Sequence, residues 1–218
     1  NYPLSGEIYK SNLLVEDIYT EDEIWSCTTC GACEEECPLG IEYIDKMVDL
    51  RRGMVDEGMV PQSLQKSLKA LEKRGNPYGK MEKKRADWTK DKEFKASWQI
   101  KDLAKDKADT LYFVDSITSY DDDMQDIARR TSIILSKAGI DFGILGKKEK
   151  DSGNEALRFG EEMLYQDLKE QNNEAITQSG VKQIVTADPH AYNALKNDYT
   201  DLPPVKHISQ VVAQKIGT

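Results

Sequence analysis

Apolar residues recur every three or four positions through the first 80 or so residues, which is the spacing of one face of a helix. Capping signals and glycine or proline stops divide this stretch into separate helices. Three helices are predicted: a short one opened by a capping box at Thr20 and Glu23, one over about 38–58, and one over about 61–75. The N-terminal part is therefore expected to be all helical.

The pattern changes near residue 108 to short apolar runs that alternate with helical spacing. Strands are predicted at 111–114, 142–145, 183–186 and 205–208, and helices over about 124–135, 154–171 and 191–197. Strands of this length alternating with helices predict βαβ units, a parallel sheet and right-handed crossovers.

These patterns divide the chain into a helical domain over 1–79, a charged linker over 80–107 and an α/β domain over 108–218. The linker is crowded with lysine, aspartate and glutamate, and Trp88, Phe94 and Trp98 are its apolar anchors. The predicted fold class is α+α/β, an all-helical domain followed by a small βαβ parallel-sheet domain.

Composition narrows the class of protein. The chain has 218 residues, 39% hydrophobic and 32% charged, as a soluble globular protein does. Its net charge of -9 argues against non-specific binding to nucleic acid and suits docking onto a basic redox partner. No apolar stretch approaches the length of a membrane span and no secretory signal is evident, while a start at Asn1 is expected of a piece of a longer chain.

All four cysteines fall within residues 27–37. Cys27, Cys30, Cys33 and Cys37, followed by Pro38, have the C-x2-C-x2-C-x3-C-P spacing of thiolates that bind a 4Fe-4S cluster. A structural zinc site or a disulfide pair is the alternative. Zinc sites usually split their cysteines into two distant pairs, so the spacing favours iron and sulfide. Clustered, reduced cysteines also indicate a cytoplasmic compartment, or a position peripheral to a membrane complex.

The identity of the fourth ligand stays open. In two-cluster ferredoxins the fourth cysteine of such a run binds the other cluster, whose own triplet lies in a second run, and this chain has no second run. Cys27, Cys30 and Cys33 could take Cys37, leave one iron to water or a carboxylate, or use a cysteine of another polypeptide. Glu34, Glu35 and Glu36 are interpreted as a solvated acidic turn rather than as ligands.

Polar residues follow three of the predicted strands. These are Asp115 and Ser116, then Asp151 and Ser152, then Asp188 with His190. Because the carboxyl ends of parallel strands meet at one edge of a sheet, we expect these loops to converge. Routine helix capping is the favoured explanation, since aspartate and serine are preferred caps. A hard divalent metal held by Asp115, Asp151, Asp188 and His190 is the weakest alternative.

The motifs together resemble the iron-sulfur oxidoreductases related to the heterodisulfide reductase D subunit, over nearly the whole chain. The segment 25–38 resembles the second of two ferredoxin-type motifs in that family, and 75–79 with 85–88 resemble its linker. The segments 111–114 and 138–146 and the pair Pro189-His190 resemble the first repeat of its cysteine-rich domain of the Cys-Cys-Gly type.

The resemblance also implies a loss. In relatives, cysteines of the Cys-Cys-Gly domain bind a further iron-sulfur centre. This chain has other residues at those positions: Ser116, Asp151, Ser152, Asp188 and Ala191. The family pattern thus implies a degenerate second site without disulfide chemistry, in a chain that corresponds to a middle section of the family's architecture.

The expected function is an electron-transfer module that relays single electrons through one 4Fe-4S cluster, which the isolated chain holds completely or in part. The implied partners are a flavoprotein or dehydrogenase subunit and another subunit that supplies a missing cluster ligand, with no nucleic acid and no membrane span. The alternatives are a redox-inactive scaffold and a natural or engineered relative whose second cluster site was removed. No independent catalytic site is identified, because neither a nucleophile-histidine pair nor a phosphate loop can be picked out.

Overall fold

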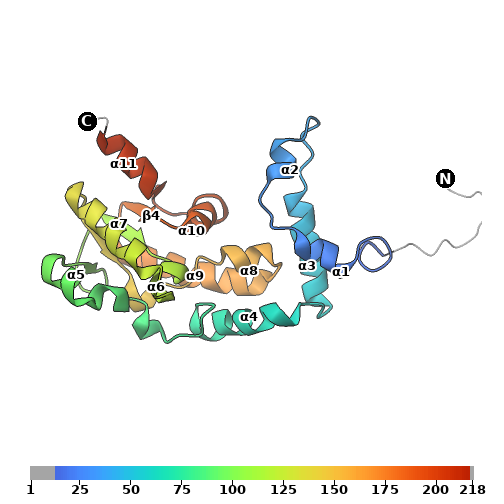
Figure 1. The fold of residues 1–218 in the computed structure, drawn as a ribbon, viewed down its shortest axis with the longest axis horizontal. Helices are drawn as coiled ribbons and strands as arrows, with labels where there is room; N and C mark the ends of the chain where they lie inside the picture. Colours follow the sequence, from blue (N-terminus) through green and yellow to red (C-terminus); the bar gives the residue numbers. More distant parts are fainter. Residues whose placement is uncertain (1–12, 217–218) are drawn as a thin grey trace, which may run out of the picture. The chain divides into compact units, whose positions relative to one another are not determined.

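The computed structural model describes residues 13–216, which form two compact units (Figure 1). Unit 1 contains the described residues up to Met59 together with Arg158–Gly160, and unit 2 contains Val60–Leu157 and the described residues from Glu161 onward. Residues 1–12, which begin the predicted helical domain, and residues 217–218 lie outside the described part. The predicted domain boundaries at residues 79 and 107 stay predictions. In the structure, the helix Gln62–Arg74, which corresponds to the third predicted helix, belongs to the same compact unit as the sheet.

Unit 1 is helical, as predicted. Its helices are α1 (Glu21–Ser26), α2 (Ala32–Glu35) and α3 (Ile44–Asp56). The predicted capping box is confirmed: the Glu23 amide donates to Thr20 Oγ1 at 3.3 Å, and the Thr20 amide donates to Glu23 Oε2 at 2.8 Å. Helix α1 contacts α3, and Ile24 is buried together with the apolar face of α3.

Helix α3 begins at Ile44, later than the expected start after Pro38. The first amides of a helix have no partner within the helix and need an external acceptor. Here Glu34 Oε1 accepts from the amides of Tyr43 and Ile44, each at 2.6 Å. Glu34 is therefore a cap of α3 as well as part of the acidic turn, and it closes the loop that carries the cysteines.

Unit 2 contains a five-stranded parallel sheet in the order β1-β3-β2-β4-β5. The strands are β1 (Lys101–Asp102), β2 (Thr110–Phe113), β3 (Phe142–Ile144), β4 (Gln183–Thr186) and β5 (Val205–His207). The four predicted strands are confirmed. Strand β1 escaped prediction because it has two residues in a charged stretch, where no apolar run marks it.

Helices and short turns of unit 2 surround the sheet. Some of the predicted helices are longer in the structure, and the one predicted over 154–171 is split into two. They are α4 (Gln62–Arg74), α5 (Lys92–Ser97), α6 (Ser116–Tyr120), α7 (Gln125–Lys137), α8 (Asn154–Arg158, whose last residue belongs to unit 1), α9 (Glu162–Ser179), α10 (Pro189–Asn193), α11 (Ile208–Ile216), the 3-10 turns η1 (Glu82–Lys84), η2 (Asp87–Lys90) and η3 (Gly146–Lys148), and the π-turn η4 (Ala194–Asp198). None of the helices in the part of the chain described here has the length and apolarity to cross a bilayer.

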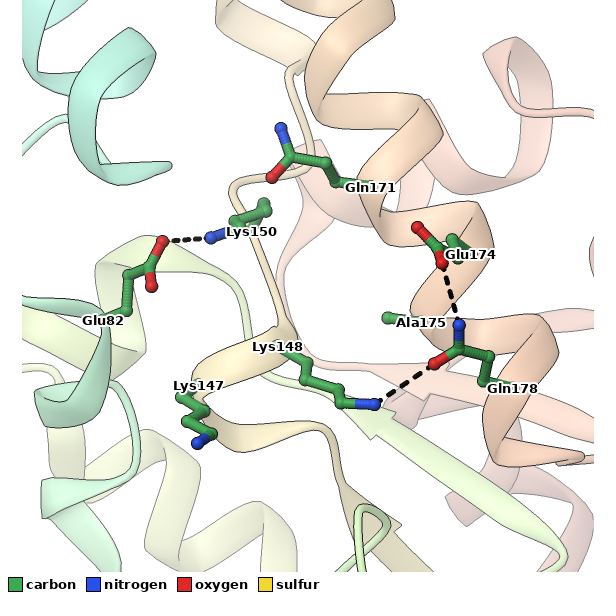
Figure 2. A pocket seen from close by; sticks show the side chains of 8 residues that line it. All are labelled: Glu82, Lys147, Lys148, Lys150, Gln171, Glu174, Ala175 and Gln178. Atoms are coloured by element: carbon green, nitrogen blue, oxygen red, sulfur yellow. Dashed lines mark hydrogen bonds and ion pairs between the residues drawn. The ribbon is translucent and has the colours of Figure 1, made fainter.

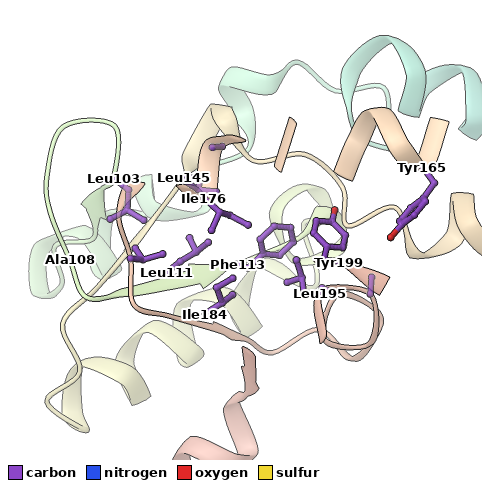
Figure 3. Packing of buried hydrophobic residues seen from close by; sticks show 14 of the residues in the cluster. Leu103, Ala108, Leu111, Phe113, Leu145, Tyr165, Ile176, Ile184, Leu195 and Tyr199 are labelled. Atoms are coloured by element: carbon purple, nitrogen blue, oxygen red, sulfur yellow. The ribbon is translucent and has the colours of Figure 1, made fainter. Parts of the chain in front are cut away.

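Both faces of the sheet are covered. Successive side chains of a strand point to opposite faces, so Leu111 and Phe113 pack with Ile176 of α9 on one face (Figure 3), while Tyr112 and Val114 pack on the other. Trp88 of the expected linker belongs to the second of these clusters and is 1% exposed. Burial on both faces explains why the strands read as continuous apolar runs.

The predicted helix over 154–171 is interrupted at Gly160. Gly160 has φ +82°, and a Cβ at this position would lie 2.6 Å from the amide nitrogen of Arg52 and 2.7 Å from the carbonyl carbon of Arg51. Segment Arg158–Gly160 thus packs its backbone directly on α3 within unit 1. Only glycine tolerates both the left-handed conformation and this approach.

Gly160→Ala is expected to destabilise the protein by more than about 1 kcal/mol, because it adds a steric clash to the strain of positive φ. Urea unfolding followed by circular dichroism measures the loss. Gly180→Ala is the matched control, since Gly180 has φ +68° with nothing within 4 Å of the added Cβ. Equal losses in the two variants would contradict a close approach at Gly160.

Candidate functional site

The four cysteines lie on the loop between α1 and α3. Cys27 follows α1 directly, and Cys33 lies within α2. Between them the backbone turns back through two left-handed residues, Thr29 at φ +53° and Gly31 at φ +76°. All four cysteines are free thiols; Cys30 and Cys33 are exposed and the other two are partly buried. The loop therefore presents unpaired sulfur near the protein surface.

Backbone amides point at the sulfur atoms of this loop. The Thr29 amide donates to Cys27 Sγ and the Ile41 amide donates to Cys37 Sγ, each at 3.4 Å. The amide of Ala32, followed by the side chain of Thr28, lowers the pKa of Cys30. The amides of Ile41 and then Leu39 lower the pKa of Cys37. Hydrogen bonds of this kind favour the thiolate, which is the form that binds metal.

A buried arginine holds the start of the loop. Arg51 of α3 is 2% exposed, and its Nη2 donates to the carbonyls of Ile24 at 2.8 Å and Cys27 at 2.5 Å. Its guanidinium carbon lies 5.2 Å from the centre of the Trp25 ring. Arg51 lies on the buried face of α3 with Ile44, Val48 and Met54, and an arginine at an apolar position of this helix is the one signal of its role that the sequence contains.

The residues of the predicted second site come together in unit 2. Ser116, Asp151, Ser152, Asp188 and Ala191 all have less than a tenth of their surface exposed. They lie beyond the carboxyl ends of β2 and β4 and in the loop after β3. Strands β2 and β4 are neighbours whose following connections lead to opposite sides of the sheet, which is the position where ligands bind in such folds.

Several polar side chains of this region accept hydrogen bonds from backbone amides at helix starts, which agrees with the helix capping that the sequence favours. Asp188 Oδ1 accepts from the amides of His190 at 2.8 Å and Ala191 at 3.0 Å, at the start of α10. Asp115 Oδ1 accepts from the amides of Ser116 at 2.6 Å and Ser152 at 3.2 Å. Asp115 itself has φ +62°, a strained conformation for a residue with a side chain.

The carboxylates of this region outnumber the cation that faces them. Arg85 Nε pairs with Glu149 at 3.0 Å, and its Nη2 lies 3.6 Å from Asp115 Oδ1. Burial, followed by the charges of Asp151 and Asp188, raises the pKa of Asp115 well above its usual range. Burial, followed by the charge of Glu155, raises the pKa of Asp151 to about 6. Protonation of these acids is thereby favoured.

The two candidate sites differ in the donors that they offer. Within residues 13–216, neither the cysteines nor the carboxylates form a gathered group of three or more metal-ligating side chains. The four thiols of the loop form no disulfide with one another. Soft sulfur donors suit an iron-sulfur cluster. Asp115 and Asp188 accept from amides at the starts of α6 and α10, and Asp151 accepts from the Gly153 amide. His190 pairs with Glu155. The donor set fits a cluster only at the cysteine loop.

A polar cavity of about 460 Å³ lies elsewhere in unit 2 (Figure 2). Two of its lysines are engaged: Lys148 donates to Gln178 at 3.2 Å and Lys150 pairs with Glu82. The lining consists of Glu82, Lys147, Lys148, Lys150, Gln171, Glu174, Ala175 and Gln178. It contains no sulfur ligand and belongs to neither candidate site.

Comparison with known proteins agrees with the cysteine spacing. Residues 3–41 match the family model described as a 4Fe-4S dicluster domain. The chain is 40% identical over 209 residues to the probable iron-sulfur-binding oxidoreductase FadF of Bacillus subtilis, covering 93% of this chain and 30% of that protein. It is 34% identical over 208 residues to the EtfAB:quinone oxidoreductase of Syntrophomonas wolfei, covering 94% of this chain and 29% of that protein.

A third relative is the D subunit of the dihydromethanophenazine:CoB--CoM heterodisulfide reductase of Methanosarcina barkeri. It is 31% identical over 206 residues, which cover 90% of this chain and 48% of that protein. The chain thus spans between about a third and a half of the length of these relatives. No solved structure matches the chain.

Proposed function

Because the chain belongs to the iron-sulfur oxidoreductases related to the heterodisulfide reductase D subunit, and binds a 4Fe-4S cluster, we propose that it relays single electrons through that cluster. The proposed ligands are Cys27, Cys30, Cys33 and Cys37. One observation carries this assignment: the four free thiols occur in ferredoxin spacing on a loop whose amides point at sulfur.

The chain's own residues have defined tasks in this proposal. A bound cluster supplies a centre that accepts and returns one electron. The amides of Thr29 and Ile41 stabilise negative charge on the sulfur ligands, and hydrogen bonds to sulfur are one of the factors that set a cluster's potential. Glu34 holds the end of the loop to α3 through the amides of Tyr43 and Ile44. The surface position of Cys30 and Cys33 suits transfer to another protein.

The second region is proposed to have no disulfide or cluster chemistry of its own. Its positions Ser116, Asp151, Ser152, Asp188 and Ala191 offer no thiolate. Hydroxyl and carboxylate groups are poor replacements for thiolates on an iron-sulfur centre. The function of unit 2 is therefore proposed to be structural support and docking in a larger oxidoreductase.

The proposed partners are electron-transfer proteins. One relative is named an EtfAB:quinone oxidoreductase, and another is part of a heterodisulfide reductase. We infer for this chain a redox partner such as a flavoprotein or dehydrogenase subunit. The net charge of -9 favours a partner with a basic docking surface.

Anaerobic reconstitution with iron and sulfide tests the proposed function. We expect about four irons per chain and, after reduction, the electron paramagnetic resonance of a cluster with one unpaired spin. Fewer than about three irons per chain would refute a cubane cluster held by this chain. The alternative function is a redox-inactive scaffold, and it predicts that the reconstituted protein holds iron but shows no reducible cluster.

A further inference from the structure

Arg51 is a buried cation whose hydrogen bonds go to backbone carbonyls. Its side chain is enclosed in unit 1, where Nη2 donates to the carbonyls of Ile24 and Cys27, and Nη1 donates to the carbonyl of Arg158 at 3.0 Å. Among residues 13–216, its Nε has no hydrogen-bond partner, and no aspartate or glutamate forms an ion pair with its guanidinium.

A guanidinium in this position is expensive to bury. Neutral carbonyls satisfy its hydrogen bonds but do not cancel its charge, and buried charges in proteins are normally paired. Arg51 Nη2 donates to the carbonyl of Cys27 at 2.5 Å, so the guanidinium lies against the start of the loop that carries the proposed ligands. The cysteine loop is therefore the part of unit 1 that can bring an anion to Arg51.

A cluster bound by four thiolates has a net negative charge that increases on reduction, and net charge is one of the properties that set its potential. A fixed positive charge in a surrounding of low dielectric stabilises the more negative state the most. The indole of Trp25 covers Arg51 and packs edge-on against Phe159, with ring centres 6.5 Å apart, so the guanidinium is kept in place and out of water.

We propose that Arg51 is the counter-charge of the cluster at Cys27–Cys37: it positions the loop through the Cys27 carbonyl and raises the reduction potential of the centre. This inference rests on the proposed function. Arg51 is a positioning residue and does not ligate iron. Its charge and its hydrogen bonds make separate contributions, and two substitutions distinguish them.

The test compares Arg51→Gln with Arg51→Lys in reconstituted protein, by redox titration monitored with electron paramagnetic resonance. Both variants lose the forked hydrogen bonds, but only Arg51→Gln loses the charge. We expect the equilibrium constant for reduction to fall about tenfold in Arg51→Gln, which is about 59 mV for one electron, and to stay within about twofold in Arg51→Lys.

Lys46→Gln is the control, because it removes one positive charge from an exposed position on the same helix. Its potential should equal that of the wild type. The proposal is overturned if Arg51→Gln retains the wild-type potential, if Arg51→Lys shifts as far as Arg51→Gln, or if Lys46→Gln shifts as far as either.

If Arg51→Gln fails to hold a cluster, the wild type provides the deciding measurement. In protein labelled with ¹⁵N-arginine, the guanidinium resonance absent from Arg51→Lys is expected to shift when the cluster is reduced, and an unchanged resonance would overturn the proposal. A wild type that holds no reducible cluster refutes the proposed function instead, so the two failures are distinguishable.

Discussion

Cys37→Ser is expected to reduce the iron content of the reconstituted protein from about four irons per chain to about three or fewer. Cys37 Sγ accepts a hydrogen bond from the Ile41 amide, and backbone amides lower the pKa of this thiol. Both effects favour the thiolate, which is the form that binds metal. Serine keeps the size of the side chain but offers no thiolate, so one corner of the cubane loses its soft ligand. Iron and sulfide analysis after anaerobic reconstitution gives the result directly.

The comparison with Cys30→Ser decides the question that spacing leaves open. If Cys37 binds the same cluster as Cys27, Cys30 and Cys33, the two variants lose iron alike. A Cys37→Ser protein with full iron, beside an iron-poor Cys30→Ser protein, would assign Cys37 to a second cluster, as in two-cluster ferredoxins. Thr28→Ser is the control, because it keeps all four thiols and the hydroxyl that faces Cys30.

Asp151→Asn is expected to stabilise the protein at pH 8 by about 1–3 kcal/mol and to have little effect near pH 4. Burial and the charge of Glu155 raise the pKa of Asp151 from 3.8 to about 6. Between these pH values the folded chain retains a proton that the unfolded chain has released. The stabilising contribution of this group is therefore fully present below about pH 4 and is lost as pH rises through about 6.

Urea unfolding at a series of pH values measures this effect. The wild type should lose stability between pH 4 and 7 more steeply than Asp151→Asn does, since asparagine has no proton to release. Asp123→Asn is the control, because Asp123 is exposed in the same unit. Parallel pH profiles for the wild type and Asp151→Asn would show that Asp151 ionises without penalty in the folded protein.

Local signals predicted most of the secondary structure. The capping box at Thr20, the left-handed glycine Gly75 that ends α4 and the four apolar strands all depend on residues close together in the sequence. Predictions were less accurate where a distant contact intervenes. Gly160 divides α8 from α9 because the backbone of α3 lies against it, and a window of neighbouring residues does not contain that information.

The cysteine spacing by itself determined the kind of cofactor, because four thiols so close along the chain suit one cluster better than any other common centre. The resemblance predicted a second site at positions that carry no thiolate in this chain. Only the tertiary structure placed Arg51 beneath the loop, Glu34 on the start of α3 and Arg85 among buried acids. The physical reason is separation along the chain. The proposed ligands lie close together in the sequence, whereas the charged groups that hold the loop and surround the buried acids come from segments that meet only in the folded chain.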